Sequence, residues 1–280
     1  MKACISQVCV LSSTFEEDIK SFVEGGCPNM EVWLTKLEKH LESASIADTK
    51  ALIADHGVNL VAGSYQGGLF LSTGEQKKSH YDHFKRRLDL CQGLGIPLMN
   101  ICADFPARVD QQILQTALAG LREAAQWAEA FNTKLSLEFR AQSSFANNLE
   151  SANTFVAASG MENVGITLDT FHFHCGPSKL ADLANINPKK LFFVQVCDIS
   201  AVPKELATDS DRIFPGDGDI DITSIIKELK RIGYDGYVSM ELLNPVISQS
   251  KTSQVTELGM GALSKILAYL HKTLLIWVKA

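Results

Sequence analysis

The sequence predicts an α/β protein built as a single (β/α)8 TIM barrel, with one domain over residues 1–280. Two observations favour this fold. Short apolar runs, typical of parallel strands covered on both faces, alternate along the whole chain with amphipathic runs of helical spacing. No linker, low-complexity tract or charge block interrupts the alternation. Eight strand–helix repeats in unbroken succession are the pattern of a barrel.

The expected strands are short and rich in Leu, Ile and Val. They cover residues 3–10, 30–34, 59–63, 97–102, 135–139, 164–169, 191–198 and 237–242. Of these, residues 30–34 have the weakest strand pattern and could belong to a helix. A doubly wound sheet is the alternative architecture, but no GxGxxG turn follows any early strand.

The expected helices lie between these strands. They cover residues 16–24, 45–56, 79–93, 110–131, 149–159, 178–184, 222–232 and 253–271. The clearest is 110–131, in which Leu114, Leu118 and Leu121 recur at three- and four-residue spacing. Glycines follow several of the helix ends, where a left-handed cap is favoured: Gly57, Gly95, Gly160 and Gly233.

Composition and charge narrow the class of protein. The chain has 26 Lys and Arg against 32 Asp and Glu, a net charge of −6, and 46% apolar residues. This is the composition expected of an ordinary soluble globular protein. No basic cluster suited to nucleic acid stands out, and no apolar run approaches the length of a membrane span. We therefore expect neither a nucleic-acid nor a membrane partner.

The cysteines and the chain ends indicate the compartment. Seven cysteines are scattered without any CxxC pair, several of them inside apolar runs, which is typical of reduced core residues. The N-terminal residues alternate like a strand and lack a convincing signal-peptide cleavage site. We expect a cytoplasmic protein. The apolar tail, residues 274–280, suggests packing against the barrel or a partner subunit, so a homo-oligomer stays open.

Polar side chains interrupt or end four consecutive late strands. They are Glu138, Asp169, Gln195 and Glu241. In a barrel these positions fall at the C-terminal mouth, where working residues gather. Buried acids need neutralisation or coordination, so three carboxylates and an amide at one mouth predict a divalent metal ion. Oxygen donors favour Mn²⁺ or Mg²⁺, with Co²⁺ or Zn²⁺ as further candidates.

Two further features adjoin this cluster. Asp169 opens the run Asp-Thr-Phe-His-Phe-His, and strand alternation would put His172 and His174 on one side. We expect His172 to bind a substrate hydroxyl or move a proton, and His174 to support it at the substrate site. An acidic, glycine-containing loop after the seventh strand carries Arg212, which could clamp a substrate oxygen. The alternative interpretation of this loop is structural, a solvated turn that ends in a helix cap at Asp221 or Thr223.

Taken in order, these runs resemble the xylose isomerase-like TIM-barrel superfamily of sugar isomerases and epimerases. The resemblance spans nearly the whole chain and is most specific over residues 135–245. It implies that Glu138, Asp169 and Glu241 are metal ligands and that His172 and Arg212 contact substrate. The Arg212 loop and the run after Asp169 look most like inosose isomerase, an enzyme of inositol and carbohydrate metabolism. Gln195 stands where the isomerases usually carry a metal-binding His, and some dehydratases of the superfamily carry Gln there.

The resemblance implies a metal-dependent isomerase or epimerase of a ketose or keto-polyol. Glu138 and Glu241 would remove and return a proton on carbon while an enediolate forms, and His172 would steady the substrate oxygen. A dehydratase acting on an inosose or on 3-dehydroshikimate is the alternative. A metal-free sugar-binding relative is a further alternative. A nuclease like endonuclease IV is disfavoured, because its site needs more His ligands than the seven scattered here.

Overall fold

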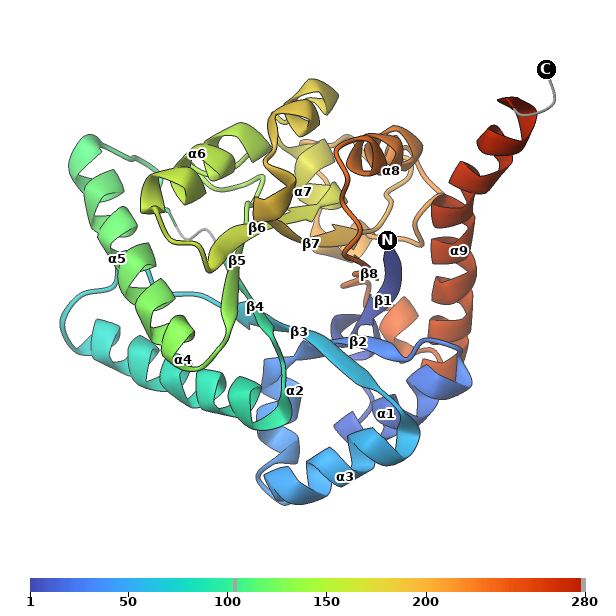
Figure 1. The fold of residues 1–280 in the computed structure, drawn as a ribbon, viewed down its shortest axis with the longest axis horizontal. Coiled ribbons are helices and arrows are strands. Elements are labelled where there is room, and N and C mark those ends of the chain that lie inside the picture. The colour runs from blue at the N-terminus through green and yellow to red at the C-terminus, as the bar shows by residue number, and fades with distance from the viewer. Residues whose placement is uncertain (103–104, 278–280) are drawn as a thin grey trace.

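Eight parallel strands form a closed barrel in which each strand pairs with the next and β8 returns to β1. The computed structural model describes the backbone of residues 1–102 and 105–277, and side chains as far as residue 268. The predicted TIM barrel is confirmed (Figure 1). The strands are β1 (Lys2–Ser6), β2 (Asn29–Trp33), β3 (Asn59–Gln66), β4 (Leu98–Cys102), β5 (Lys134–Glu138), β6 (Val164–Asp169), β7 (Leu191–Val196) and β8 (Tyr237–Met240).

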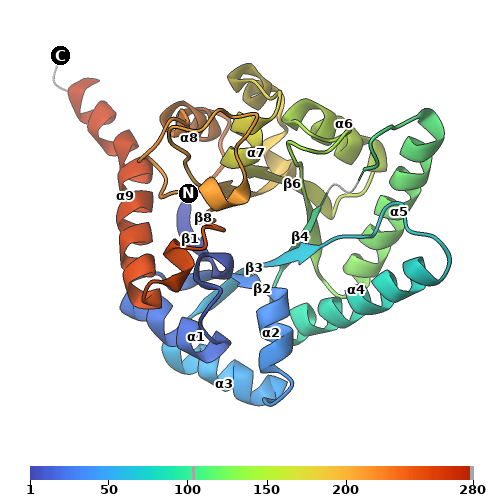
Figure 2. The ribbon, with the colours of Figure 1, turned by 180° about the vertical axis from the view of Figure 1, so that it is seen from behind.

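Helices surround the barrel, and α9 runs along its outer side next to α1 and α8 (Figures 1 and 2). The helices are α1 (Phe15–Glu24), α2 (Leu34–His40), α3 (Ile46–His56), α4 (Gly74–Leu94), α5 (Gln111–Ala130), α6 (Leu149–Ser159), α7 (Thr170–Cys175), α8 (Ile222–Arg231) and α9 (Thr252–Trp277). Left-handed glycines end three of them, at Gly57, Gly95 and Gly160, as the sequence predicts. Gly233, two residues past α8, also has a positive φ, of 85°.

Several predicted bounds are wrong at the ends of strands. The first strand stops at Ser6, and residues 7–10 form the 3-10 helix η1 (Gln7–Val10). At this break the Gln7 side chain accepts from the backbone N–H of Trp33 at the end of β2 and donates to Asp18 of α1. Residues 178–184 hold no α-helix, and the 3-10 helix η2 (Leu180–Asn185) stands there. The short helices α2 and α7 were not predicted.

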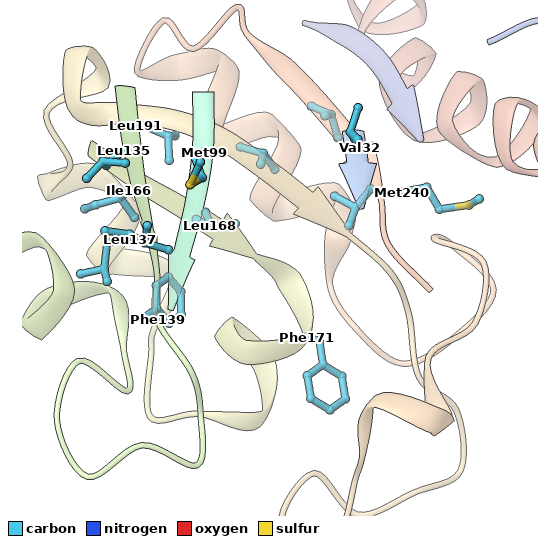
Figure 3. Close-up of a cluster of buried hydrophobic side chains, with 14 of the residues drawn as sticks. Val32, Met99, Leu135, Leu137, Phe139, Ile166, Leu168, Phe171, Leu191 and Met240 are labelled. Carbon is cyan, nitrogen blue, oxygen red and sulfur yellow. The ribbon is translucent and has the colours of Figure 1, made fainter. Parts of the chain in front are cut away.

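Hydrophobic residues pack on the outer face of the sheet against the helices. Figure 3 shows part of this layer, in which Leu135 and Leu137 of β5 lie beside Ile166 and Leu168 of β6. The alternate residues of the same strands, Ser136 and Glu138 among them, point to the barrel interior. The sheet therefore buries apolar side chains outward and brings its polar ones together inside.

The barrel interior has two distinct layers. An apolar cluster of Cys4, Val61, Ala62, Leu98 and Phe193 fills the end where the strands begin. Two residues further along each strand the inward side chains become polar, as in the step from Phe193 to Gln195 on β7. These polar side chains form the floor of the C-terminal mouth.

Six of the seven cysteines are buried, and Cys175 is half-buried. None of the helices in the described part of the chain has the length and apolar content to span a bilayer. The side chains of the apolar tail, residues 274–280, lie outside the described residues.

Candidate active site

A cavity of about 230 Å³ opens at the C-terminal mouth of the barrel. Its lining includes the strand-end acids Glu138 and Glu241, together with Arg140, His172 and Arg212. A larger hollow of about 640 Å³ lies beside it, between residues 11–16 and α2, and shares Leu11 and Trp33 with it. The smaller cavity is the candidate active site, because the chemically capable side chains converge there.

Glu138, Asp169 and His172 form the tightest group of ligand atoms. One donor atom of each lies within 4.8 Å of the others, and all three residues are buried. His172 Nε2 stands 3.3 Å from Glu138 Oε1 and 4.0 Å from Asp169 Oδ2. The structure therefore brings the predicted acids of β5 and β6 together with the predicted histidine.

Helix α7 places His172, and strand alternation does not. Asp169 Oδ1 accepts from the backbone N–H of Phe171 at 2.7 Å, which caps the helix directly after β6. In a helix, residues two apart lie on roughly opposite sides, so the expectation that His172 and His174 share one side is wrong. His172 is 2% exposed and lines the cavity. His174 is half-buried and is not among the lining residues, and a substrate role for it stays a prediction.

Arg212 occupies the centre of the acid cluster. Its Nη1 lies 2.7 Å from Asp169 Oδ2 and 3.2 Å from Glu241 Oε2, and its Nη2 lies 2.9 Å from Asp209 Oδ1. The side chain is 1% exposed. Burial lowers the pKa of this guanidinium, but the surrounding carboxylates, Asp169 first, hold the pKa well above its usual value. The arginine predicted to reach the mouth does so, and it is paired with protein carboxylates there.

Asp198 fixes the loop that carries Arg212. Its Oδ1 accepts from the backbone N–H groups of Ile199 and Ile220, and its Oδ2 accepts from that of Gly216. Gly218 allows the close approach, because a Cβ there would lie 2.2 Å from the Ile199 carbonyl oxygen and 2.5 Å from Asp198 Oδ1. The same loop caps α8 through Asp221, which accepts from the N–H of Ser224. The helix-cap interpretation of the loop is confirmed at Asp221, and a contact of Arg212 with substrate stays a prediction.

Gln195 joins the ends of β7 and β8 to β2. Its Nε2 donates to Glu241 Oε1 and to Glu31 Oε1, each at 2.8 Å. Its Oε1 is buried and has no hydrogen-bond partner among the described residues. Both amide hydrogens are thus used, and the carbonyl oxygen is left for another partner.

Glu31 and Arg140 are two residues at the mouth that the sequence prediction missed. Glu31 is fully buried on β2, where Oε1 accepts from Asn100 and Gln195 and Oε2 accepts from Ser239. The signal for Glu31 was an acid inside the apolar run Met-Glu-Val-Trp, the same kind of interruption that marks the late strands. It was overlooked because this strand has the weakest pattern of the eight.

The acids differ in their electrostatic surroundings. Burial, helped by Glu138, raises the pKa of Glu31 to about 7. Burial also raises the pKa of Glu241 well above its usual value, although Arg212 opposes the shift. Burial is also the largest influence on Glu138, but His172, Arg212 and Arg140 together outweigh it and lower the pKa of that carboxyl. In the metal-free protein the pKa values of Glu138 and Glu241 are therefore shifted in opposite directions.

The residues at the mouth fit a divalent cation. Gln195 Oε1 and Asp169 Oδ2 are buried and lack a hydrogen bond among the described residues, although Asp169 is ion-paired with Arg212. Glu138 supplies a further carboxylate oxygen within reach of Asp169. The Nδ1 of His172 accepts from the backbone N–H of Ala141, so its Nε2 carries a hydrogen and can donate to an oxygen atom. Carboxylate and amide oxygens suit Mn²⁺ and Mg²⁺, with Co²⁺ and Zn²⁺ as further candidates.

Fold and site together define a TIM-barrel protein with an acid cluster at the C-terminal mouth of its barrel. The family model of the xylose isomerase-like TIM barrel matches residues 22–265. The chain belongs to this family.

Several known proteins are similar over most of this chain. The inosose isomerase of Bacillus velezensis is 28% identical over 252 residues, which are 88% of this chain and 89% of that protein. The 3-dehydroshikimate dehydratase of Pseudomonas aeruginosa is 26% identical over 84% of this chain but only 37% of its own length. A crystal structure of the IOLI protein with a bound zinc atom superposes with a TM-score of 0.90 at 25% identity, covering 96% of this chain and 99% of that one.

Proposed function

We propose that this protein is a divalent-metal-dependent sugar isomerase or epimerase that acts on a ketose or a keto-polyol of the inosose type. The observation that carries the proposal is the convergence of Glu138, Asp169 and His172, with Glu241 across the same cavity. Relatives named inosose isomerase, 2-oxo-tetronate isomerase and L-ribulose 3-epimerase support this reaction class.

Glu138, Asp169, Gln195 and Glu241 would hold the ion. When bound, the ion would polarise the substrate carbonyl and a neighbouring hydroxyl. Its preferred identity is Mn²⁺ or Mg²⁺ on the oxygen donors, with Zn²⁺ supported by the zinc in the similar IOLI structure. We expect this reaction to run in the cytoplasm on a small substrate, without nucleic acid or membrane, and the oligomeric state stays a prediction.

The chain's own residues move the proton. One of Glu138 and Glu241 takes a proton from the carbon beside the carbonyl, and the other returns a proton to the neighbouring carbon or to the opposite face. His172, 3.3 Å from Glu138, donates to the substrate oxygen and steadies the developing negative charge. Arg212 holds Asp169 and Glu241 in place through its ion pairs.

Proton exchange tests the proposal. The purified protein with Mn²⁺ is incubated in D₂O with a panel of ketoses and inososes, and deuterium at carbon is followed by NMR and mass spectrometry. We expect one substrate to gain deuterium at the carbon beside its carbonyl and to yield an isomer of otherwise unchanged mass. Removal of metal with a chelator should stop the exchange, and Mn²⁺ should restore it. Exchange with no ketose or inosose would contradict the proposal.

A dehydratase acting on a 3-dehydroshikimate-like acid is the second candidate. Gln195 favours it through the resemblance, since some dehydratases of the superfamily carry Gln at this position. Arg140 also favours it. Arg140 is half-buried, lines the cavity and has no ion-pair partner among the described residues. A guanidinium in that setting suits the carboxylate of a keto acid.

Product analysis separates the two candidates. Loss of water from a dehydroshikimate gives a conjugated product that absorbs in the ultraviolet, whereas isomerisation conserves mass. If the dehydratase is correct, Arg140→Met should raise KM for the acid strongly, and the same change should leave turnover of a neutral ketose nearly unaltered. An unchanged KM would remove the argument from Arg140.

A further inference from the structure

We propose that Glu31 is a positioning residue for the metal site, because it orients the Gln195 amide so that the carbonyl oxygen is free to bind the ion. The proposal rests on the proposed function in one respect, which is that Gln195 is a metal ligand. It adds a residue on β2, on the far side of the barrel interior from the predicted late-strand cluster.

The first step is the count of hydrogen bonds on Gln195. A side-chain amide has two N–H donors on its nitrogen and acceptor capacity only on its oxygen. Both donors have carboxylate partners at 2.8 Å, Glu31 Oε1 and Glu241 Oε1. A flipped amide would point its oxygen at two carboxylates and its N–H groups toward the ion, so the two acids select one orientation.

The second step is the rigidity of Glu31. Its carboxylate is fully buried and accepts from Asn100 and Ser239 besides Gln195. Asn100 is held in turn, since its oxygen accepts from Thr167 at 2.8 Å. Side chains from the three strands β4, β6 and β8 therefore hold the Glu31 carboxylate of β2 in place beneath Gln195. Glu241 alone would hold only one of the two amide hydrogens, and it is itself a predicted ligand and proton carrier.

The third step concerns the carbonyl oxygen of Gln195, which remains after both amide hydrogens are bonded. Gln195 Oε1 is buried without a hydrogen-bond partner among the described residues, a costly arrangement for an amide oxygen. Coordination of a cation by this oxygen removes the cost. Residues that orient a metal ligand typically alter metal affinity by about 10–100-fold when they are changed. Glu31 meets this description although it needs no contact with the ion.

Two substitutions of Glu31 distinguish positioning from charge. In Glu31→Gln the new amide oxygen can still accept from Gln195 and Asn100, while its N–H groups can donate to Ser239. In Glu31→Leu no acceptor remains. We expect Glu31→Leu to weaken Mn²⁺ binding about tenfold or more, measured by titration calorimetry on the substrate-free protein, and Glu31→Gln to keep most of the affinity. Ser136→Ala is the matched control, because Ser136 belongs to the same buried polar layer and its hydroxyl accepts from Thr167, with no hydrogen bond to Glu31, Asn100 or Gln195 among the described residues.

A double-mutant cycle completes the test. In a Gln195→Leu background there is no amide to orient, so adding Glu31→Leu should not weaken Mn²⁺ binding further. Full additivity of the two changes would overturn the proposal, and so would wild-type affinity in Glu31→Leu. Should Glu31→Leu fail to fold, a tenfold loss in Glu31→Gln would also contradict it, since that variant keeps the acceptor. A wild-type protein that binds no Mn²⁺, Mg²⁺, Co²⁺ or Zn²⁺ would instead refute the metal-dependent function and this proposal with it.

Discussion

Arg212 Nη1 lies 2.7 Å from Asp169 Oδ2, and the same nitrogen is 3.2 Å from Glu241 Oε2. One guanidinium thus bridges acids at the ends of β6 and β8, two strands that are not neighbours in the sheet. The arginine neutralises carboxylates that would otherwise repel each other in a buried site. The same carboxylates would attract a divalent cation, so we expect Arg212 and a bound ion to compensate the negative charge together.

Replacement of Arg212 should therefore make the fold depend on metal. Removing one partner of a buried ion pair costs about 3–5 kcal/mol, so Arg212→Ala should lower the melting temperature of the metal-free protein by several degrees or more. Saturating Mn²⁺ should stabilise this variant more than it stabilises the wild type. Differential scanning calorimetry with and without Mn²⁺ measures both effects. Arg231→Ala is the control, because Arg231 pairs with Glu228 at 2.6 Å with 61% of its side chain exposed. Equal metal-induced shifts in wild type and Arg212→Ala would refute shared compensation.

The carboxylates of Glu138 and Glu241 should matter for turnover far more than for stability. Loss of a positioned acid–base group costs roughly 10²–10⁴-fold in rate. We expect Glu138→Gln and Glu241→Gln each to lower kcat within that range at saturating Mn²⁺, with a much smaller change in melting temperature, because Gln keeps the size and an oxygen donor. Glu162→Gln, at a side chain 96% exposed, should leave both quantities unchanged. Normal turnover in Glu241→Gln would exclude its role as a proton carrier.

Much of the site could be predicted from sequence, because an isolated acid stands out in an apolar strand. Glu138, Asp169, Gln195 and Glu241 were recognised in this way, and the first two lie within one ligand cluster. Glu31 is also an isolated acid in an apolar strand, but it was missed because residues 30–34 have the weakest strand pattern of the eight.

Other features depend on tertiary contacts that spacing does not reveal. The run Thr-Phe-His-Phe-His alternates like a strand, yet the Asp169 carboxylate turns it into a helix by capping the N–H of Phe171. Lys36 of α2 is a further example, since it is only 7% exposed and its Nζ lies 2.7 Å from Asp18 Oδ2 of α1. Asp18 and Lys36 are 18 residues apart in the sequence, so no local pattern predicts this pair.

Asp198 should be necessary for the position of Arg212. Asp198→Ala removes the acceptor for three backbone N–H groups, those of Ile199, Gly216 and Ile220. Each buried donor left without a partner costs about 1–3 kcal/mol. We expect a clear loss in the free energy of unfolding, measured in urea. We also expect the loop to be less ordered both with and without Mn²⁺, seen as faster amide exchange over residues 209–221. Asp219→Ala is a suitable control, since Asp219 accepts at an exposed part of the same loop from the N–H of Ala201. Unchanged amide exchange in Asp198→Ala would contradict this assignment.

Glu31 should give the metal-free protein a specific dependence of stability on pH. Its pKa rises from 4.5 to about 7 on folding, chiefly because of burial. The native state therefore binds more protons than the unfolded state between these values, and the free energy of unfolding falls as pH rises. The contribution of Glu31 is fully present below pH 4.5 and is lost as pH passes about 7. Glu31→Gln cannot titrate at this position. The free energy of unfolding of the wild type should therefore fall relative to that of Glu31→Gln as pH rises from 4.5 to about 7.

Urea unfolding in the presence of a chelator, at half-unit steps between pH 4.5 and 7.5, measures this difference. The comparison of the wild type with Glu31→Gln isolates the titration of Glu31 together with its influence on the pKa of Glu241. With saturating Mn²⁺ the slope should flatten, because a nearby cation favours the ionised form of Glu31 and brings its folded pKa back toward 4.5. A difference that stays constant with pH in the metal-free protein would show that Glu31 keeps one protonation state throughout.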